Sequence, residues 1–174
     1  MATVTYKNQP AIHATRGNVP LAGNSHLYTV KKVLWPDSIQ EFLPTLFVGK
    51  TYHICCGKSL LGDVRIDLDP ENKPDIICNA SNMKDFIKDN EADTVLCDPP
   101  YNGKFQWNHD LLTELQRIAN KRIIFQHWFI PATSDGMYKK AHDKFELVET
   151  YVWQGKAYFG RAQIISVFDR IKEA

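Results

Sequence analysis

The 174-residue sequence lacks any long hydrophobic run. Its longest apolar stretches, such as Ile123–Phe125, span only a few residues, whereas a helix that crosses a bilayer needs about 20. The amino-terminal segment contains no apolar core of the kind that a secretory signal peptide requires. We therefore expect no membrane partner, and cytoplasmic localisation is the default expectation.

The sequence also lacks the C-x-x-C spacing that is typical of zinc sites, and it contains no internal repeat. Its four cysteines are Cys55, Cys56, Cys78 and Cys97, and most of them lie in apolar, strand-like runs. We interpret them as buried, reduced thiols of the core, and we predict no metal site. With 44% hydrophobic and 24% charged residues, the composition excludes fibrous and disordered classes.

Acidic residues are absent from residues 1–36, which carry four basic ones. Residues 37–112 hold 13 acidic and 7 basic residues, and residues 113–174 hold 10 basic and 7 acidic ones. The formal net charge is +1, so basic ends flank an acidic middle. This pattern is compatible with nucleic-acid phosphates at the two ends and, equally, with an ordinary solvated surface.

From residue 51 onward, short apolar runs alternate with helical patterns. We expect strands at residues 51–56, 64–68, 74–78, 92–97, 121–126, 146–153 and 162–168, and helices at 36–47, 80–89, 107–119 and 134–143. Strands separated by helices predict a mostly parallel sheet, and the closeness of the last two predicts an antiparallel hairpin at one edge. Only seven residues separate Cys56 from Val64, so no full helix fits between the first two of these strands.

The first 50 residues do not continue this alternation. Residues 1–30 are rich in Asn, Thr, Gly, Pro and His and show little periodicity, which predicts an irregular arm or an extended cover. We expect Pro44 to kink or end the helix at 36–47. The chain therefore divides into an N-terminal arm and helix, residues 1–50, which covers the sheet or contacts substrate, and an α/β domain, residues 51–174.

Each of the first four strands of this domain ends in a segment that suits ligand binding. In an open α/β sheet such strand ends share one edge, and ligands bind near the point where the strand order reverses. A glycine there allows close backbone approach, and a carboxylate after the second strand can accept both hydroxyls of a ribose. The segments are Cys55-Cys56-Gly57-Lys58-Ser59, Asp67-Leu68-Asp69, Cys78-Asn79-Ala80 and Asp98-Pro99-Pro100-Tyr101-Asn102.

The most specific of these segments is Asp98-Pro-Pro-Tyr101. Its two prolines donate no backbone hydrogen bonds, so the loop presents carbonyl acceptors beside the Asp98 carboxylate. A carboxylate and a carbonyl together accept both hydrogens of an exocyclic amine, and Tyr101 can stack on a planar base. The segment therefore predicts a site for the amino group of a nucleobase.

Residues 51–168, about two-thirds of the chain, resemble class I S-adenosylmethionine-dependent methyltransferases of the amino-methylating group, whose catalytic motif matches Asp98–Tyr101. The resemblance implies a Rossmann-like, three-layer α/β sandwich with a seven-stranded, mostly parallel sheet and an antiparallel last strand. The implied catalytic residues are Asp98, Pro99, Pro100 and Tyr101. The implied cofactor contacts are Cys55, Cys56, Gly57, Lys58, Asp67, Leu68, Asn79, Ala80, Met83 and Asp98, with Asp69 as a second candidate for the ribose.

The implied activity is methyl transfer from S-adenosylmethionine to an exocyclic amine of a nucleobase, with N6 of adenine in DNA as the leading target. One alternative is an RNA enzyme that acts on adenine N6 or guanine N2. Another is a catalytically silent methyltransferase-like subunit, because His53, Ser59 and Asn79 replace an acid, a glycine and an aspartate of the family pattern. The predicted nucleic-acid contacts are Arg16, Lys31, Lys32, Asn102, Lys156 and Arg161.

Two further interpretations fit the sequence poorly. Gly57-Lys58-Ser59 resembles the end of a phosphate-binding loop, but Tyr52 stands where that loop requires its first glycine. A cysteine nucleophile for cytosine C5 methylation would have to follow the fourth strand, and no cysteine follows Cys97.

Overall fold

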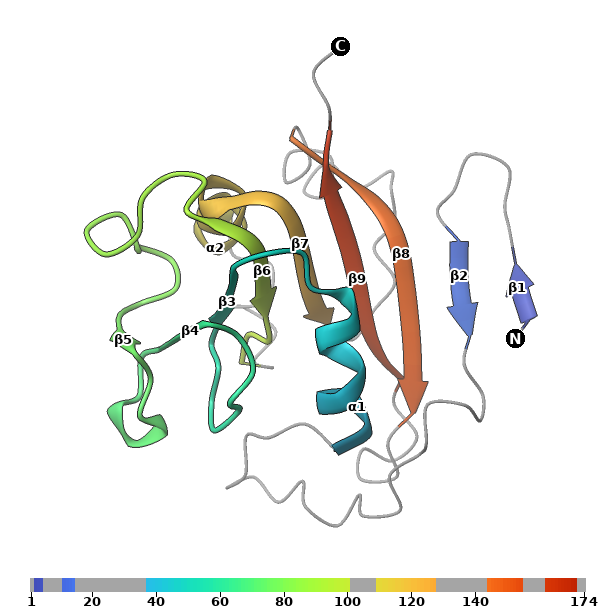
Figure 1. Cartoon of the computed structure of the whole chain (residues 1–174), viewed down its shortest axis with the longest axis horizontal. Coiled ribbons are helices and arrows are strands. Elements are labelled where there is room, and N and C mark those ends of the chain that lie inside the picture. The colour runs from blue at the N-terminus through green and yellow to red at the C-terminus, as the bar shows by residue number, and fades with distance from the viewer. Residues whose placement is uncertain are drawn as a thin grey trace.

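The computed structural model describes residues 2–4, 11–14, 37–100, 109–127, 144–154 and 162–171. Within these ranges nine strands form one sheet in the order β1-β2-β8-β9-β7-β6-β3-β4-β5 (Figure 1). The strands are β1 (Ala2–Val4), β2 (Ala11–Ala14), β3 (Thr51–Ile54), β4 (Val64–Asp67), β5 (Ile76–Ile77), β6 (Ala92–Cys97), β7 (Ala119–His127), β8 (Phe145–Gln154) and β9 (Ala162–Arg170). The helices are α1 (Asp37–Phe42), α2 (His109–Ile118) and the short 3-10 helices η2 (Leu43–Leu46) and η3 (Pro70–Asn72).

The strands β3 to β9 form the seven-stranded sheet that the sequence predicts. Five neighbouring strands of this sheet are parallel to one another, in the order β5, β4, β3, β6 and β7. β9 lies between β7 and β8 and is antiparallel to both. The predicted Rossmann-like α/β fold, with a mostly parallel sheet and an antiparallel last strand, is therefore confirmed. The bounds of β6 are those predicted, whereas β3 and β5 are shorter than expected.

The segment before residue 15 extends this sheet. β2 pairs in parallel with β8, from Ala11 opposite Glu149 to Ala14 opposite Val152, and β1 pairs antiparallel with β2. The expectation of an irregular arm is therefore wrong for these two short strands, and the β8–β9 hairpin does not form the edge of the sheet. A four-residue strand leaves too little periodicity in a sequence to be recognised.

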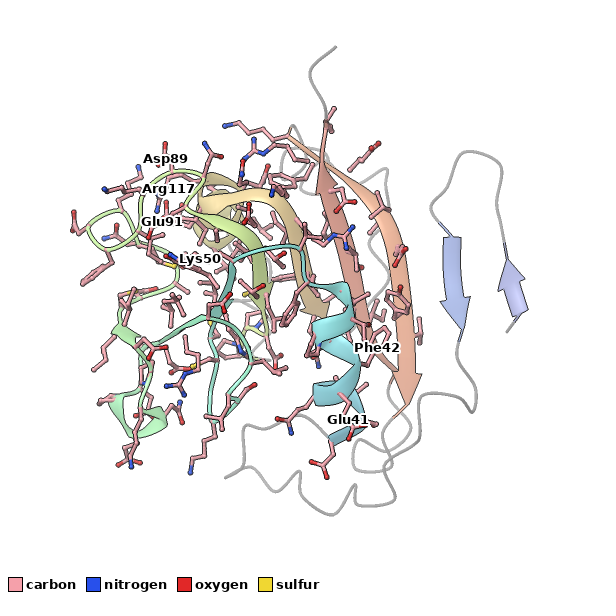
Figure 2. All side chains as sticks on the ribbon, viewed as in Figure 1. Glu41, Phe42, Lys50, Asp89, Glu91 and Arg117 are labelled. Atoms are coloured by element: carbon pink, nitrogen blue, oxygen red, sulfur yellow. The ribbon has the colours of Figure 1, made fainter. Side chains whose placement is uncertain are left out.

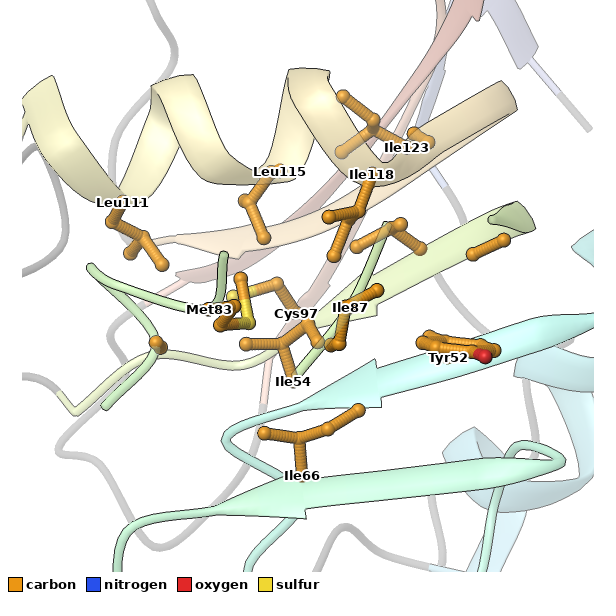
Figure 3. Close-up of a cluster of buried hydrophobic side chains, with 14 of the residues drawn as sticks. Tyr52, Ile54, Ile66, Met83, Ile87, Cys97, Leu111, Leu115, Ile118 and Ile123 are labelled. Atoms are coloured by element: carbon orange, nitrogen blue, oxygen red, sulfur yellow. The ribbon is translucent and has the colours of Figure 1, made fainter. Parts of the chain in front are cut away.

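Alternate residues of the central strands face two separate hydrophobic clusters. In β6, Val95 and Cys97 belong to the cluster that includes Leu111, Leu115 and Ile118 of α2 (Figure 3). Leu96 belongs to the opposite cluster, with Ile39, Leu43 and Leu46 from α1 and η2. Because successive side chains of a strand point to opposite faces, the two helices cover opposite sides of the sheet. The described elements therefore form three layers (Figure 1).

The helix before the first core strand ends where Pro44 predicts. The α-helix stops at Phe42, and η2 continues with Pro44 in its first turn. The ring of Phe42 meets the ring of Tyr151 on β8 edge-on, with centroids 4.9 Å apart (Figure 2). This contact adds to the packing of the helix on the sheet face.

Turns rather than helices connect β3, β4 and β5. Residues 55–63 join β3 to β4 without a helix, as the short spacing predicts. Asp63 extends the pairing of these strands, because its N–H donates to the Thr51 carbonyl at 2.8 Å and its Oδ2 accepts the Thr51 N–H at 2.7 Å. Asp75 repeats this arrangement with Arg65 before β5. Aspartate side chains thus complete backbone pairing at the starts of two short strands.

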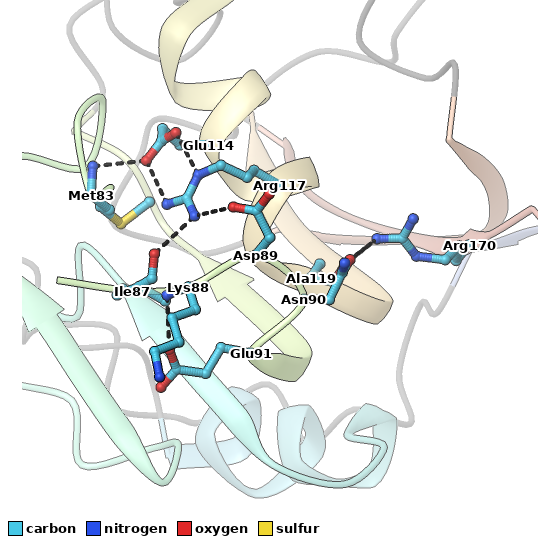
Figure 4. Close-up of polar contacts among 10 residues, drawn as sticks. All are labelled: Met83, Ile87, Lys88, Asp89, Asn90, Glu91, Glu114, Arg117, Ala119 and Arg170. Carbon is cyan, nitrogen blue, oxygen red and sulfur yellow. Dashed lines mark hydrogen bonds and ion pairs between the residues drawn. The ribbon is translucent and has the colours of Figure 1, made fainter. Parts of the chain in front are cut away.

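The connection between β5 and β6 corrects one prediction, because residues 80–89 form turns and not a helix. Met83 and Ile87, four residues apart in this segment, are both buried. Side chains of α2 hold the segment instead. Glu114 accepts the Met83 N–H at 2.7 Å, and Arg117 donates to the Ile87 carbonyl at 2.8 Å (Figure 4).

In the part of the chain that the structure describes, no helix has the length and apolar character needed to cross a membrane. The helix expected at residues 134–143 lies outside the described residues. The division of the chain at residue 50 stays a prediction.

Candidate functional site

The strand order reverses between β3 and β6, which are neighbours in the sheet although β4 and β5 separate them in the chain. At their carboxyl ends Ile54 pairs with Cys97, and the N–H of Asp98 donates to the Ile54 carbonyl at 3.4 Å. The turn at residues 55–59 and the Asp98 motif therefore leave the sheet side by side. Open α/β sheets bind their ligands at this position.

The turn after β3 contains two residues with positive φ, Cys55 at 56° and Gly57 at 53°. Gly57 adopts this conformation without a steric penalty, whereas Cys55 places a side chain in a region that residues other than glycine rarely occupy. Cys56 and Gly57 are buried, and Lys58 is exposed. Strain of this kind is concentrated at functional sites.

Asp67, the last residue of β4, accepts two backbone N–H groups. Its Oδ2 accepts the Gly57 N–H at 2.8 Å, and its Oδ1 accepts the Asp69 N–H at 2.9 Å. The residue is half-buried, and a carboxylate offers about four acceptor positions. The backbone thus fixes the orientation of the carboxylate while leaving it capacity for two hydroxyl groups. This acceptor capacity fits the two hydroxyl groups of the ribose in the cofactor that the resemblance implies.

The residues around Asp67 differ in their access to a ligand. Leu68 is 66% exposed and presents apolar surface beside the carboxylate. Asn79 is also exposed, and its Oδ1 accepts the Ser81 N–H at 2.9 Å, while its amide nitrogen is a hydrogen-bond donor. Asp69 accepts the Glu71 N–H and so caps η3, which gives it a local structural role.

The side chains of Ala80 and Met83, which are among the predicted cofactor contacts, are buried. The Met83 side chain has no exposed surface, and Ala80 is only 6% exposed. Both belong to the cluster between α2 and the sheet. In this structure their side chains support the segment that follows Asn79 from within the core.

The Asp98 motif begins directly at the end of β6. Asp98 is half-buried, Pro99 is buried and Pro100 is exposed. Tyr101 and Asn102 lie outside the described residues. The structure thus places the first three residues of the motif at the reversal point of the strand order, and the role of Tyr101 stays a prediction.

His53 stands where the family pattern has an acid, and its ring is buried. The residue is 1% exposed, and its Nδ1 lies 3.1 Å from the Leu61 carbonyl oxygen. Burial lowers the pKa of His53 to about 4, so the ring is neutral at physiological pH. Ser59 is buried as well, and its Oγ accepts the Leu61 N–H at 3.3 Å. Both departures from the family pattern therefore stabilise the β3–β4 connection.

All four cysteines are free, and Cys56, Cys78 and Cys97 are buried, as predicted for core thiols. Burial raises the pKa of Cys56 to about 12, which keeps its thiol protonated at neutral pH. Cys55 is only half-buried and differs from the other three in this respect.

Glu114 and Arg117 support the candidate site from α2, and the sequence analysis did not single them out. Glu114 is 3% exposed and accepts two hydrogen bonds from Arg117, at 2.8 and 2.9 Å (Figure 4). Arg117 also donates to Asp89 at 2.8 Å. The hydrogen bond with Arg117 lowers the pKa of Glu114 and keeps it charged. The sequence signal is an oppositely charged pair three positions apart on the apolar face of a helix.

The basic residues predicted to contact nucleic acid lie outside the described residues, namely Arg16, Lys31, Lys32, Lys156 and Arg161. Their role stays a prediction.

Comparison of the chain with models of known protein families gives no match, and comparison with curated proteins gives none either.

Proposed function

We propose that this chain transfers a methyl group from S-adenosylmethionine to an exocyclic amine of a nucleobase, with N6 of adenine in DNA as the leading target. The observation that carries the proposal is the hydrogen bond from the Asp98 N–H to the Ile54 carbonyl at the reversal of the strand order. This hydrogen bond lies beside the glycine turn, which would hold the cofactor, and the Asp98 motif, which would hold the amine. The two must be adjacent if the methyl group is to pass from the cofactor to the amine.

The residues at the ends of β4 and β5 would hold and orient the cofactor. S-adenosylmethionine, when bound, supplies an electrophilic methyl group on a positively charged sulfur. The Asp67 carboxylate would accept hydrogen bonds from the ribose hydroxyls, because the Gly57 and Asp69 N–H groups already hold it in place. Leu68 supplies apolar surface, and Asn79 supplies a side-chain donor, for the adenine ring.

Asp98 and Pro99 would position the target amine, and the Asp98 carboxylate would stabilise its developing charge. The Asp98 carboxylate and the Pro99 carbonyl would each accept one N–H of the target amine, which leaves the nitrogen lone pair free to attack. As the nitrogen gains positive charge, the Asp98 carboxylate stabilises it and is placed to accept its proton. Holding both reactants in line contributes roughly 7–11 kcal/mol to such a reaction. A duplex substrate would need its base flipped out, at a cost of a few kcal/mol.

The direct test uses the full chain with methyl-labelled S-adenosylmethionine and, in separate reactions, duplex DNA, single-stranded DNA and RNA, followed by mass spectrometry of nucleosides. We expect label on N6 of adenine from DNA. Asp98→Ala should lower the rate at least about a hundredfold, as expected for loss of one positioned polar group. Asp85→Ala, which removes an exposed acid from the 80–89 segment, is the matched control and should retain the rate.

The other outcomes separate the alternatives. Label that appears only in RNA favours the RNA enzyme. If calorimetry shows no binding of S-adenosylmethionine and no substrate gains label, the proposal is wrong and the silent subunit is favoured. Unchanged transfer in Asp98→Ala would contradict the assigned site while leaving the activity in place.

A further inference from the structure

Three cysteine side chains gather on the sheet face that α2 covers. Cys97 ends β6 and belongs with Ile54 to the buried cluster on that face (Figure 3). Cys78 belongs to the same cluster, and Cys55 packs against it. A residue that follows Ile54 in an extended strand would point to the opposite face. The positive φ of Cys55, 56°, is the departure from extended backbone that lets its side chain join Cys97.

Cys55 packs against the buried cluster that contains Cys97. Cys97 has no exposed surface, burial raises the pKa of its thiol, and a hydrogen bond with Cys55 raises that pKa further. Cys55 is half-buried and is therefore the member of the pair that a reagent in solution can reach. An accessible thiol and a buried thiol thus meet at the strand ends that flank the candidate site.

The register of β3 and β6 gives this pair the backbone spacing of a disulfide. Ile54 is the partner of Cys97 across two parallel strands, and Cys55 is one residue further along the chain. A strand spacing of about 4.8 Å and a rise of about 3.3 Å per residue place the two Cα atoms about 6 Å apart. Disulfides join Cα atoms that are roughly 4.4–6.8 Å apart.

The other cysteines fit a bond with Cys55 less well. Cys56 is its chain neighbour, with a Cα separation of about 3.8 Å, which is below the usual range for a disulfide. Cys78 follows β5, which β4 separates from β3. Two strand spacings place it roughly 10 Å away, which is beyond that range. Cys97 is therefore the partner that the backbone selects.

We propose that Cys55 and Cys97 form an oxidation site that closes to a disulfide when the protein meets a peroxide. The Cys55 sulfur attacks hydrogen peroxide, the O–O bond breaks, and a sulfenic acid and one water form. The Cys97 sulfur then attacks the Cys55 sulfur, the S–S bond forms as the S–O bond breaks, and the hydroxide leaves as a second water with the thiol proton. The two thiols lose two electrons, and the peroxide is reduced to two waters.

The disulfide would fasten the turn after β3 to the base of the Asp98 motif. Gly57 and Asp98 stand within two residues of the bonded cysteines, so the bond constrains both sides of the candidate site. Displacement of reacting groups by about 1 Å can lower a rate about a hundredfold. We therefore expect oxidation to lower methyl transfer reversibly, and this consequence, unlike the bond itself, rests on the proposed function.

Peptide mapping tests the bond without any assay of activity. The full chain is treated with hydrogen peroxide at pH 7 and pH 8.5, free thiols are blocked with N-ethylmaleimide, and the protein is digested with trypsin without reductant. Trypsin places Cys55 and Cys56 on peptide 51–58 and Cys97 on peptide 89–104. The expected product is these two peptides joined, with a mass equal to their sum less two hydrogens plus one N-ethylmaleimide on Cys56. It should form faster at pH 8.5, because the buried Cys97 thiol must lose its proton to attack.

Variants identify the bonded sulfurs. Cys56→Ala and Cys78→Ser should retain the linked product, whereas Cys55→Ser should abolish it. In Cys97→Ala, with folding checked by circular dichroism, the sulfenic acid on Cys55 should persist and be trapped by dimedone. If Cys97→Ala does not fold, the first three variants still decide the partner.

A link from peptide 51–58 to peptide 66–84, which carries Cys78, would overturn the proposal. So would a bond within peptide 51–58, or oxidation of Cys55 to sulfinic acid without any cross-link. Failure of methyl transfer in the reduced protein contradicts the proposed function and leaves the mapped disulfide as evidence for the oxidation site.

Discussion

A Cβ atom at Gly49 would lie 2.2 Å from Oδ2 of Asp93. The same Oδ2 accepts the Lys50 N–H at 3.0 Å, and Gly49 has a φ of +64°. The turn that leads into β3 is therefore built against a side chain at the start of β6. This contact aligns the two central strands from their amino ends, before they meet again at Ile54 and Cys97.

We predict that Gly49→Ala lowers the free energy of unfolding by about 2–4 kcal/mol, because positive φ and overlap with Asp93 both disfavour a Cβ atom. Urea denaturation measures this change. In an Asp93→Ala background the overlap is gone, and Gly49→Ala should cost only about 1–2 kcal/mol. Equal costs in the two backgrounds would show that the contact with Asp93 does not matter.

Glu114 is expected to be essential for the stability of the segment between β5 and β6. Glu114→Ala leaves the buried Met83 N–H without its acceptor and removes the carboxylate that pairs with Arg117, so it should lower the free energy of unfolding by about 3 kcal/mol. Glu114→Gln retains an acceptor and should cost less. Hydrogen exchange of residues 83–87 in both variants locates the effect. Loss of protection spread evenly over the sheet would contradict this local role.

The same carboxylate gives a pH dependence. Arg117 lowers the pKa of Glu114 below its ordinary value of 4.5, so its contribution to stability is present above that pH and is lost as the pH falls further. The stability difference between wild type and Glu114→Gln should therefore shrink below pH 4.5. A constant difference would mean that the charge of Glu114 is not what stabilises the protein.

His53 should make the protein less stable in mild acid. Its pKa in the folded protein is about 4, whereas the unfolded chain binds a proton near pH 6.5. The contribution is complete above pH 6.5 and is lost as the pH falls toward 4, at most about 3 kcal/mol. Urea denaturation at pH 7.5, 5.5 and 4.5 measures the slope. In His53→Gln this slope should be smaller, and parallel curves for the two proteins would refute the assignment.

Asp67 and Asp69 separate the cofactor role from a local structural role. Asp67→Ala should weaken binding of S-adenosylmethionine tenfold or more, because hydrogen bonds to a charged group are worth about 1.5–3 kcal/mol each. Asp69→Ala removes the cap of η3 and retains the backbone N–H that Asp67 accepts, so affinity should change little. Isothermal calorimetry compares the two. A larger loss in Asp69→Ala would move the ribose site by two residues.

The basic N-terminal residues are expected to bind phosphate. Each phosphate contact contributes roughly −0.9 to the slope of log affinity against log salt on duplex DNA, so Lys31→Ala with Lys32→Ala should flatten the slope by about 2. Lys84→Ala with Lys88→Ala removes the same charge from the acidic middle and is the matched control. Affinity for S-adenosylmethionine should not change. An unaltered slope would mean that residues 1–36 do not bind nucleic acid.

Local pattern predicted those elements whose ends carry strong signals. β6 has its expected bounds because an apolar run meets Asp98-Pro99-Pro100, where the prolines remove backbone donors. α1 ends before Pro44 for the same reason. A helix is predicted at residues 80–89, but hydrogen bonds with Glu114 and Arg117 stabilise turns there. Tertiary contacts outweighed a weak local preference in that segment.

The sequence by itself determined the succession of strands along the chain and the residue types at their ends. Both follow from periodicity and from glycine, proline and carboxylate residues, whose effects extend over only a few residues. Only the tertiary structure decided which of these ends meet. The pairing of Ile54 with Cys97, the bond from Gly57 to Asp67 and the strand β2 beside β8 join residues far apart in the chain. Such contacts depend on which strands pair across the whole sheet and on which side chains share a face. A local pattern of residues predicts neither.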